Sequence, residues 1–509
     1  MFLTRRRLRS ATSAVIAAVA FAGCSNAGTT SDLPAVTHLT LGPTEVRVMS
    51  FNIWLGGELV DLNKVVEAIR ESGADVVGLQ EAEGNSRRIA DLLGWAHVDE
   101  QLQIISRYQL ISPPAGAGVF LYVQLSPGQI FAMSNIHLPS DPYGPYLVRD
   151  GSSLGEVLNN EEITRMEALN RFLPEWKNLI AADMPLVVTG DFNSPSHLDW
   201  GADDVGERPH MKFAVEWPVS RAIYDIGLID TYRTAHRNAG TRPGLTWTFG
   251  YPHGRLNPNE AADRIDWVLA TAGTTVLDSK VVGPAEEPDV DVAISPWPSD
   301  HNGVVSRLRV TPVEPPLFVA VEGVRHERGD RVTVRYHSPL DETAARLALV
   351  RAGAAVPAAV IHSVPTLEAS FHGAYAFGTG TLTPGEYEVA LISDDGELDA
   401  PRARFWVVEP GSLPSVAVQN ATPRADQPLT LRWSSTPGRK WDWIAVYAAD
   451  DPNLANYYGY AYTNATVNGS ITWSPSELTD FGLEPGEWIA RVMSDDGYVV
   501  LAEARFTLG

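Results

Sequence analysis

The stretch Pro185-Leu-Val-Val-Thr-Gly-Asp-Phe-Asn193 decides the fold of the first half of the chain. Its apolar run, residues 185–189, is typical of a strand that is buried on both faces of a sheet. Gly190 allows a tight turn after the strand, and this turn presents Asp191 and Asn193 at the strand's end. An isolated Gly-Asp-Phe-Asn string can also be an ordinary turn, so its meaning depends on the neighbouring strands.

Other short apolar runs in this half share the same design, because each has a polar residue at or just beyond one end. The runs cover residues 46–51, 74–79, 130–136, 264–269 and 304–310, and the polar residues near their ends are Asn52, Gln80, Glu81, His137, Asp266 and His301. Buried strands with polar ends are typical of a sheet whose edge carries a functional site.

A helix is predicted between the first two of these strands. Val65, Val66 and Ile69 recur on one helical face, Asp61 precedes them as a possible N-cap, and Gly73 ends the pattern. The alternation of strand and helix predicts an α/β domain.

The segment from Asp141 to Glu161 shows no such clear pattern and is expected to be a long loop. It contains Tyr143, Tyr146 and Arg149, and insertions of this kind often decide substrate choice.

The chain changes character after about Pro315, where short β-type runs alternate with turn residues. An internal repeat marks two units: the string 382–387 matches 483–488, and Ser-Asp-Asp-Gly occurs at 393–396 and again at 494–497. We therefore expect two immunoglobulin-like β-sandwich modules, residues 315–410 and 412–509. The Asp-Asp-Gly strings favour hairpin turns, with calcium binding as the alternative.

The N-terminus has the pattern of an export signal. Residues 1–23 hold four arginines followed by a short apolar run, which predicts a signal peptide. The string Phe21-Ala22-Gly23-Cys24 resembles a bacterial lipobox, so Cys24 is predicted to carry a lipid, and residues 24–43 to form a flexible tether. We expect a protein on the outer face of the bacterial cell membrane. An ordinary secretory cleavage site is the alternative.

Composition and charge limit the functions that the chain can have. The formal net charge is −23, and lysine occurs only five times, without a long basic run. Such a surface repels nucleic acid and anionic lipid at long range, which lowers the expectation of a nuclease without excluding it. Because Cys24 is the only cysteine, the chain can form neither an internal disulfide nor a thiolate metal cluster.

Six motifs in the first half occur in the order that is typical of one superfamily. They are Met49-Ser-Phe-Asn52, Gly78-Leu-Gln-Glu81, Asn135-Ile-His-Leu138, Thr189-Gly-Asp-Phe-Asn193, Asp263-Arg-Ile-Asp266 and Ser299-Asp-His301. Together they resemble the signatures of the endonuclease/exonuclease/phosphatase superfamily. The resemblance implies a four-layer α/β/β/α sandwich as the catalytic domain, which we place at residues 44–312.

The resemblance also implies a site for a hard divalent cation. Glu81 would be the principal metal ligand, and Asn52, Asp300 and Asp191 would join it. Oxygen ligands of this kind suit Mg²⁺ or Mn²⁺, and Ca²⁺ is possible. Such an ion neutralises a phosphate and activates water.

Two histidines carry the expected acid and base chemistry. Asp266 would hold the imidazole of His301, which then acts as general base or as a phosphate contact. His137 lies at a strand end and could donate a proton to the leaving oxygen, but the sequence does not identify its carboxylate partner.

The remaining predicted site residues orient water and substrate. Asp191 would bind metal or orient the attacking water, and Asn193 would donate to a phosphoryl oxygen. Asn135 and Trp247 are predicted to contact substrate. Trp247 lies near the motifs, as do Trp54, Trp267 and Trp297, although packing is the commoner role of tryptophan.

We therefore expect an exported, membrane-anchored, metal-dependent phosphoester hydrolase, most readily a phosphodiesterase of the nuclease or sphingomyelinase-like kind. A phosphomonoesterase for sugar or inositol phosphates is one alternative, and an inactive surface-binding lipoprotein is another. The expected partners are the phosphoester substrate and the membrane. Nucleic acid would be bound only as substrate, and the protein is expected to be a monomer.

Overall fold

The computed structural model describes residues 42–509, apart from 117, 249–259, 286, 288, 339–344, 357, 366–371, 421–422 and 496. The predicted signal peptide, Cys24 and residues 24–41 of the tether lie outside the described residues. Within the described part, no helix has the length and apolar character needed to cross a bilayer.

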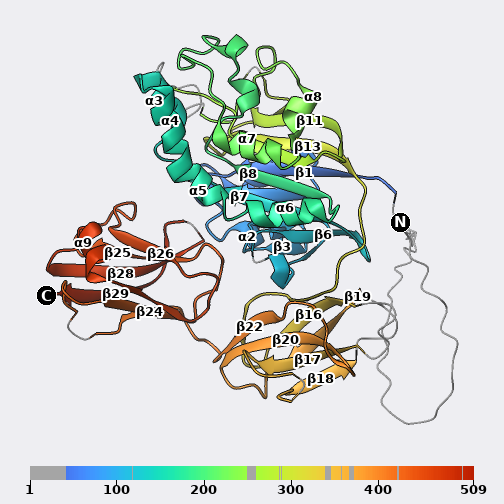
Figure 1. Ribbon diagram of the computed structural model, residues 1–509, viewed down its shortest axis with the longest axis vertical. Coiled ribbons are helices and arrows are strands. Elements are labelled where there is room, and N and C mark those ends of the chain that lie inside the picture. Colours follow the sequence, from blue (N-terminus) through green and yellow to red (C-terminus); the bar gives the residue numbers. More distant parts are fainter. Residues whose placement is uncertain are drawn as a thin grey trace, which may run out of the picture. The chain divides into compact units, whose positions relative to one another are not determined.

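Two sheets form the centre of the first half (Figure 1). The first sheet has the strand order β12-β11-β13-β1-β2-β4-β3, and its strands are β1 (Thr44–Asn52), β2 (Val76–Gln80), β3 (His97–Asp99), β4 (Ile104–Ser106), β11 (Thr275–Pro284), β12 (Val292–Ile294) and β13 (Gly303–Val310). The second has the order β5-β6-β7-β8-β10-β9, with β5 (Gln109–Ile111), β6 (Leu121–Ser126), β7 (Gln129–His137), β8 (Leu186–Asp191), β9 (Leu228–Asp230) and β10 (Asp266–Thr271).

Helices connect these strands and cover the outer faces of the sheets. The α-helices are α1 (Leu62–Ser72), α2 (Ser86–Leu93), α3 (Gly144–Asp150), α4 (Leu154–Glu161), α5 (Glu167–Leu169), α6 (Leu173–Ala181), α7 (Pro218–Asp225) and α8 (Thr231–Ala235). Short 3₁₀ turns are η1 (Leu55–Gly57), η2 (Pro114–Gly116), η4 (His197–Asp199) and η5 (Ala202–Asp204), and η3 (Glu162–Met166) is a π-helical segment.

Three apolar clusters separate four layers. One cluster joins the inner faces of the two sheets, with Val48 from β1 against Phe131 from β7. A second packs α1 and α2 on the outer face of the first sheet, and a third packs α6 and α7 on the outer face of the second. Burial of these apolar faces drives the assembly. The chain therefore has the α/β/β/α sandwich that its motifs imply.

The predicted helix after the first strand is present with its predicted ends. The Asp61 side chain accepts a hydrogen bond from the Asn63 backbone N–H at 2.9 Å, which caps α1. Gly73 ends the helix in the left-handed conformation, with φ at 69°.

Two local predictions were wrong. The segment predicted as a long loop contains α3 and α4, because Ser153 and Glu156 form a reciprocal capping box that starts α4. The strand predicted to begin at Arg264 begins at Asp266, because the backbone of Asp263 pairs with that of Trp247.

Polar side chains join the two sheets near the site. The Asn135 carboxamide oxygen accepts hydrogen bonds from Gln80 Nε2 at 2.7 Å and from Thr189 Oγ1 at 2.8 Å. Gly78 leaves the room for them, since a Cβ there would lie 2.0 Å from Thr189 Oγ1 and 2.3 Å from Asn135 Oδ1. In the same layer, Ser50 Oγ accepts from the Gly190 N–H at 3.0 Å. These bonds fix how the strand ends of one sheet meet those of the other.

The rest of the chain forms two all-β units, each with two sheets around its own apolar core. The strands of the first are β14 (Phe318–Val321), β15 (Arg325–Glu327), β16 (Arg331–His337), β17 (Arg346–Arg351), β18 (His362–Pro365), β19 (His372–Gly378), β20 (Gly385–Ser393), β21 (Gly396–Glu397) and β22 (Ala403–Val408). The second contains β23 (Ser415–Val418), β24 (Leu429–Ser434), β25 (Trp443–Ala448), β26 (Gly459–Tyr462), β27 (Gly469–Trp473), α9 (Pro475–Asp480), β28 (Gly486–Ser494) and β29 (Val499–Leu508). The first Asp-Asp-Gly string forms the tight turn of a hairpin, in which Ser393 pairs with Gly396.

Candidate active site

Strand geometry brings the polar strand ends of the two sheets together. Asn52 ends β1, His137 ends β7 and Asp191 ends β8, and Glu81 follows β2 directly. β1 and β2 are parallel, as are β7 and β8, so each pair ends at the same edge of its sheet. β10 runs antiparallel to β8, so its first residue, Asp266, lies beside Asp191.

The Asn52 side chain connects two carboxylates that come from different sheets. Its Nδ2 donates to Glu81 Oε1 at 3.1 Å and to Asp191 Oδ2 at 3.0 Å. Its Oδ1 accepts from the Trp54 N–H at 3.0 Å, which fixes the orientation of the amide. Glu81 is held further by the Leu55 N–H, 2.9 Å from Oε2. Both carboxylates are therefore oriented by donors.

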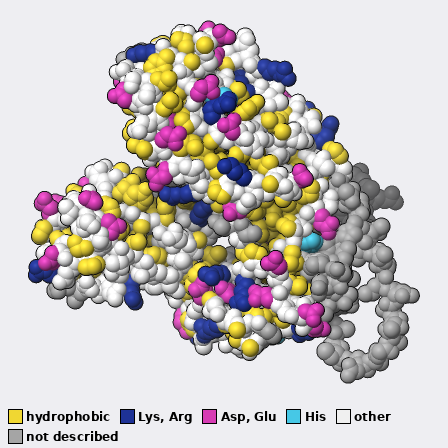
Figure 2. All heavy atoms as spheres, viewed as in Figure 1, with side chains coloured by type: hydrophobic (Ala, Val, Ile, Leu, Met, Phe, Trp, Pro, Cys, Tyr) yellow, Lys and Arg dark blue, Asp and Glu magenta, His cyan; other side chains and the backbone are white. Residues whose placement is uncertain are grey.

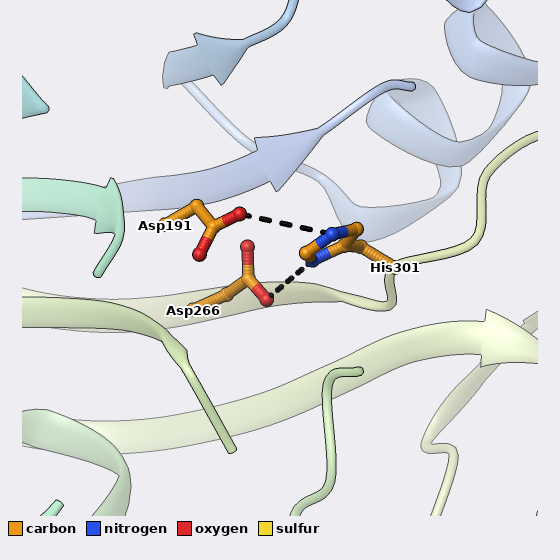
Figure 3. A group of neighbouring side chains, drawn as sticks. All are labelled: Asp191, Asp266 and His301. Atoms are coloured by element: carbon orange, nitrogen blue, oxygen red, sulfur yellow. Dashed lines mark hydrogen bonds and ion pairs between the residues drawn. The ribbon is translucent and has the colours of Figure 1, made fainter. Parts of the chain in front are cut away.

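His301 lies between two aspartates, as Figure 3 shows. Its Nδ1 is 3.0 Å from Asp266 Oδ2, and its Nε2 is 3.7 Å from Asp191 Oδ2. Asp266 is fully buried and His301 is nearly so. The predicted pairing of Asp266 with His301 is present, and it places a proton on Nδ1.

The charge of this pair follows from its surroundings. Burial disfavours the charged imidazole, but the negative charges of Asp266 and Asp191 outweigh burial and raise the pKa of His301 to about 10. Burial also raises the pKa of Asp266 to about 6, against the opposing effect of His301. His301 is thus an imidazolium at neutral pH, a hydrogen-bond donor suited to contact a phosphoryl oxygen.

Two residues that the motif comparison gave no role hold this dyad in place. Ser299 Oγ donates to the Asn52 carbonyl at 2.7 Å and accepts from the His301 N–H at 3.0 Å. Thr246 Oγ1 accepts from the backbone N–H of Asp266 at 3.0 Å. Ser299 lies inside the Ser-Asp-His motif, so its place in the sequence could have identified it as a residue that holds His301. Thr246 carried none, because its role depends on a contact between distant segments.

His137 lies near Asp191, the aspartate that His301 also faces. Its Nε2 is 3.5 Å from Asp191 Oδ2, and its side chain is 26% exposed, which leaves it accessible to a substrate. Asp191 is the carboxylate partner that the sequence did not identify. The predicted proton donation by His137 stays a prediction.

The donor set fits a hard divalent cation. Asp300 Oδ1 and Asp266 Oδ1 are buried without a hydrogen-bond partner among the described residues, and unpartnered buried oxygens are what a cation would satisfy. Burial raises the pKa of Asp300, and the charges of Glu81 and Asp191 add to this effect, although His301 opposes it. The carboxylates of Asp300, Glu81 and Asp191 are therefore close enough to influence one another electrostatically.

Two groups of residues in the site could hold the ion. Ligand atoms of Asp191, Asp266 and His301 all lie within 4.8 Å of one another. However, Asp266 and His301 already bind each other, and a cation there would compete with that bond. Of the group predicted from the motifs, Glu81, Asp191 and Asp300 leave the dyad intact. Asn52 directs its Nδ2 at these carboxylates and its Oδ1 at the Trp54 N–H, so it would become a ligand only if its amide turned over.

The two predicted asparagines differ in how far they are free to meet a substrate. Asn193 Nδ2 donates one bond to the Leu138 carbonyl at 2.9 Å, which leaves its second N–H. Asn135 donates to the carbonyls of Leu79 and Leu102 and accepts from Gln80 and Thr189, so its amide joins the two sheets. Contact between Asn135 and substrate would require those bonds to break.

Among the tryptophans near the motifs, Trp247 has its ring beside the imidazole of His301, whereas Trp297 donates from Nε1 to the His301 carbonyl at 2.8 Å. The Trp247 ring centroid is 6.2 Å from that of His301, and the ring packs edge-on against Tyr143 at 5.1 Å. Trp267 stacks on Phe192, and Trp297 packs against Phe51. The last two therefore pack behind the site, whereas Trp247 is half-buried beside it.

Residues 49–301 match the model of the Endonuclease/Exonuclease/phosphatase family. The chain belongs to this family through that segment, and its members are hydrolases that act on phosphoesters.

Several individual proteins are similar to at least half of this chain. An uncharacterised protein of Caenorhabditis elegans is 28% identical over 287 residues, which are 51% of this chain and 90% of that protein. An endonuclease/exonuclease/phosphatase from Beutenbergia cavernae is 19% identical and covers 71% of this chain and 99% of its own, with a TM-score of 0.34. An AP endonuclease from Leishmania major is 13% identical, with coverages of 52% and 88% and a TM-score of 0.33.

The raised pKa of His301 predicts its titration in the metal-free protein. An ordinary histidine loses its second ring proton near pH 6.5. Because the neighbouring carboxylates stabilise the imidazolium, His301 should keep both ring protons past that pH and lose one only near pH 10. Asp266→Asn removes the nearest negative charge and should bring the midpoint down toward 6.5. Nitrogen-detected NMR of labelled histidine measures both midpoints.

Asp225→Asn, an exposed position on α7, is the matched control and should leave the titration of His301 unchanged. A wild-type midpoint at or below 6.5 would contradict the electrostatic description of the dyad.

Proposed function

We propose that this chain is an exported, membrane-anchored phosphodiesterase that depends on a divalent metal ion, with Mg²⁺ or Mn²⁺ as the ion. The observation that carries the proposal is the convergence of Glu81, Asn52, Asp191 and the Asp266–His301 dyad at one edge of two sheets. These are the oxygen ligands and the imidazole that phosphoester hydrolysis requires.

The metal would be held by the carboxylates of Glu81, Asp191 and Asp300, and when bound it would neutralise phosphate charge and activate water. The Asn52 amide, whose Nδ2 faces Glu81 and Asp191, orients two of these carboxylates. Asp191 can also accept a hydrogen bond from the attacking water. His301, as an imidazolium, donates to a phosphoryl oxygen, and His137 donates a proton to the leaving oxygen. Asn193 has one N–H left for the same phosphoryl group.

The charges around the site support a diester rather than a monoester. Among the described residues, no lysine or arginine forms an ion pair with Glu81, Asp191 or Asp300. A monoester dianion would meet this acidic site without the basic clamp that phosphoryl groups usually receive, whereas a diester carries a single charge. A nuclease and a sphingomyelinase-like enzyme both act on diesters, and the proposal covers both.

The visible surface offers little support for a long nucleic acid. On the face drawn in Figure 2, the basic side chains of the described residues are scattered among acidic and apolar ones and form no continuous band. Affinity for a polyanion depends on the number of phosphates that basic groups contact.

The proposed activity predicts a specific response to metal and to substitution. EDTA should abolish hydrolysis of bis-p-nitrophenyl phosphate, and added Mg²⁺ or Mn²⁺ should restore it. Glu81→Gln removes a ligand charge and His301→Asn removes the imidazolium, so each should lower kcat/KM by at least about 100-fold. Initial rates on this diester and on p-nitrophenyl phosphate measure both the loss and the diester preference.

Glu175→Gln on α6 is a matched control for the carboxylate substitution and should keep the wild-type rate. Unchanged turnover in folded Glu81→Gln or His301→Asn protein would refute the assignment. Faster hydrolysis of the monoester than of the diester would replace the proposal with a phosphomonoesterase.

The anchoring part of the proposal rests on the basic and apolar start of the chain and on Cys24. Expressed from its full sequence in a bacterium, the wild-type protein should partition into the detergent phase of a Triton X-114 extraction, because an acyl chain supplies the needed apolar area. Cys24→Ser should move the protein to the aqueous phase. Wild-type protein in the aqueous phase would contradict the lipid anchor.

A further inference from the structure

A fully buried ion pair lies next to the candidate site without belonging to it. Arg165 Nη1 is 3.0 Å from Glu161 Oε1, and neither side chain has any exposed surface. Exchanging a buried pair for apolar residues of similar volume is often neutral or stabilising, so stability alone is a weak reason for its presence. Its directional hydrogen bonds suggest a different role.

The pair sits where the helical chain changes its winding. Glu161 is the last residue of α4, and Arg165 lies in the π-helical segment η3 that follows. Wide turns of this kind recur at functional sites in proteins. Here the wide turn places an arginine and a glutamate four residues apart with both side chains directed into the protein.

The guanidinium fastens the segment that follows His137. Arg165 Nη2 donates to the Ser140 carbonyl at 2.6 Å, and Nη1 donates to the Pro142 carbonyl at 2.9 Å. Residues 139–142 are exposed, so apolar packing does little to hold them. Asn160 Nδ2 also donates to the Pro142 carbonyl, at 2.9 Å, whereas the Ser140 carbonyl is held by the buried guanidinium.

The carboxylate fastens the turn that carries Asn193. Glu161 Oε2 accepts from Ser194 Oγ at 2.9 Å, and Ser194 is fully buried. Asn193, its neighbour, donates to the carbonyl of Leu138, which follows His137. One ion pair thus connects the segments that leave the ends of β7 and β8.

We propose that Glu161 and Arg165 are a positioning pair that fixes His137 and Asn193 relative to each other at the candidate site. The inference rests on the proposed phosphodiesterase function. An arginine suits this role because its planar fork can bind a carboxylate and two carbonyls at once, which a lysine cannot.

Ser194→Ala is the least disruptive test of the pair, because it removes the hydrogen bond to Glu161 and little volume. We expect kcat on bis-p-nitrophenyl phosphate to fall about 10-fold with KM within about twofold, since misplacement of reacting groups lowers the rate more than binding.

Arg165→Lys tests the guanidinium partner of the pair. Amide hydrogen exchange in peptides that cover residues 138–143 should speed up at least about 10-fold relative to wild type.

Ser196→Ala is the matched control, because Ser196 is a buried serine two residues further on that does not contact the pair. It should leave kcat and the exchange of residues 138–143 unchanged. If Ser194→Ala and Ser196→Ala lower kcat equally, the pair has no positioning role. Unchanged exchange and unchanged kcat in Arg165→Lys would overturn the proposal as well.

The two proposals fail in different ways. Wild-type protein that hydrolyses no phosphodiester in the presence of Mg²⁺ or Mn²⁺ would refute the proposed function. The exchange measurement requires no activity, so it decides whether Arg165 holds the segment after His137 in either case.

Discussion

The repulsion between carboxylates gathered in a buried place is the constraint on which the site depends. Glu81 and Asp191 come from different sheets, and Asp266 lies beside Asp191 in the register of β8 and β10. Like charges that are withdrawn from water repel one another strongly. The fold keeps them together by placing donors between them: the Asn52 amide between Glu81 and Asp191, and the His301 imidazolium between Asp191 and Asp266.

These donors are useful only if the two sheets keep a fixed offset, and polar contacts between the sheets provide it. The Asn135 amide binds Gln80 on the first sheet and Thr189 on the second, and Ser50 binds the backbone of Gly190. The Asn135 amide uses both of its N–H donors and accepts two hydrogen bonds, and a buried amide that is satisfied in this way specifies one arrangement better than apolar packing does. The motif residues therefore divide into two groups, one that faces the substrate space and one that sets the distance between the sheets.

The sequence predicted the parts of this arrangement that depend on local pattern. Apolar strands with polar ends, the capped helix at Asp61, and the ordered motifs gave the α/β/β/α sandwich, and the resemblance gave the pairing of Asp266 with His301. Contacts between distant segments were not predictable. Thr246 meets Asp266 across 20 residues of sequence. His137 and Asp191 come from different strands, and the Glu161–Arg165 pair forms at an irregular helix. The helices α3 and α4 were missed because their short amphipathic faces gave too weak a period, although the Ser153 and Glu156 capping box was a readable signal.

We infer that these groups bind one hard cation on the Glu81 side and leave the Asp266–His301 dyad unbroken. An anomalous difference map from a crystal of the protein soaked in Mn²⁺ tests it most directly. We expect one strong peak bound by Glu81, with Asp191 or Asp300 completing the set, and His301 Nδ1 still bonded to Asp266. A peak that is bound by His301 and Asp266 in place of their mutual bond, or no peak at this edge of the sheets, would contradict it.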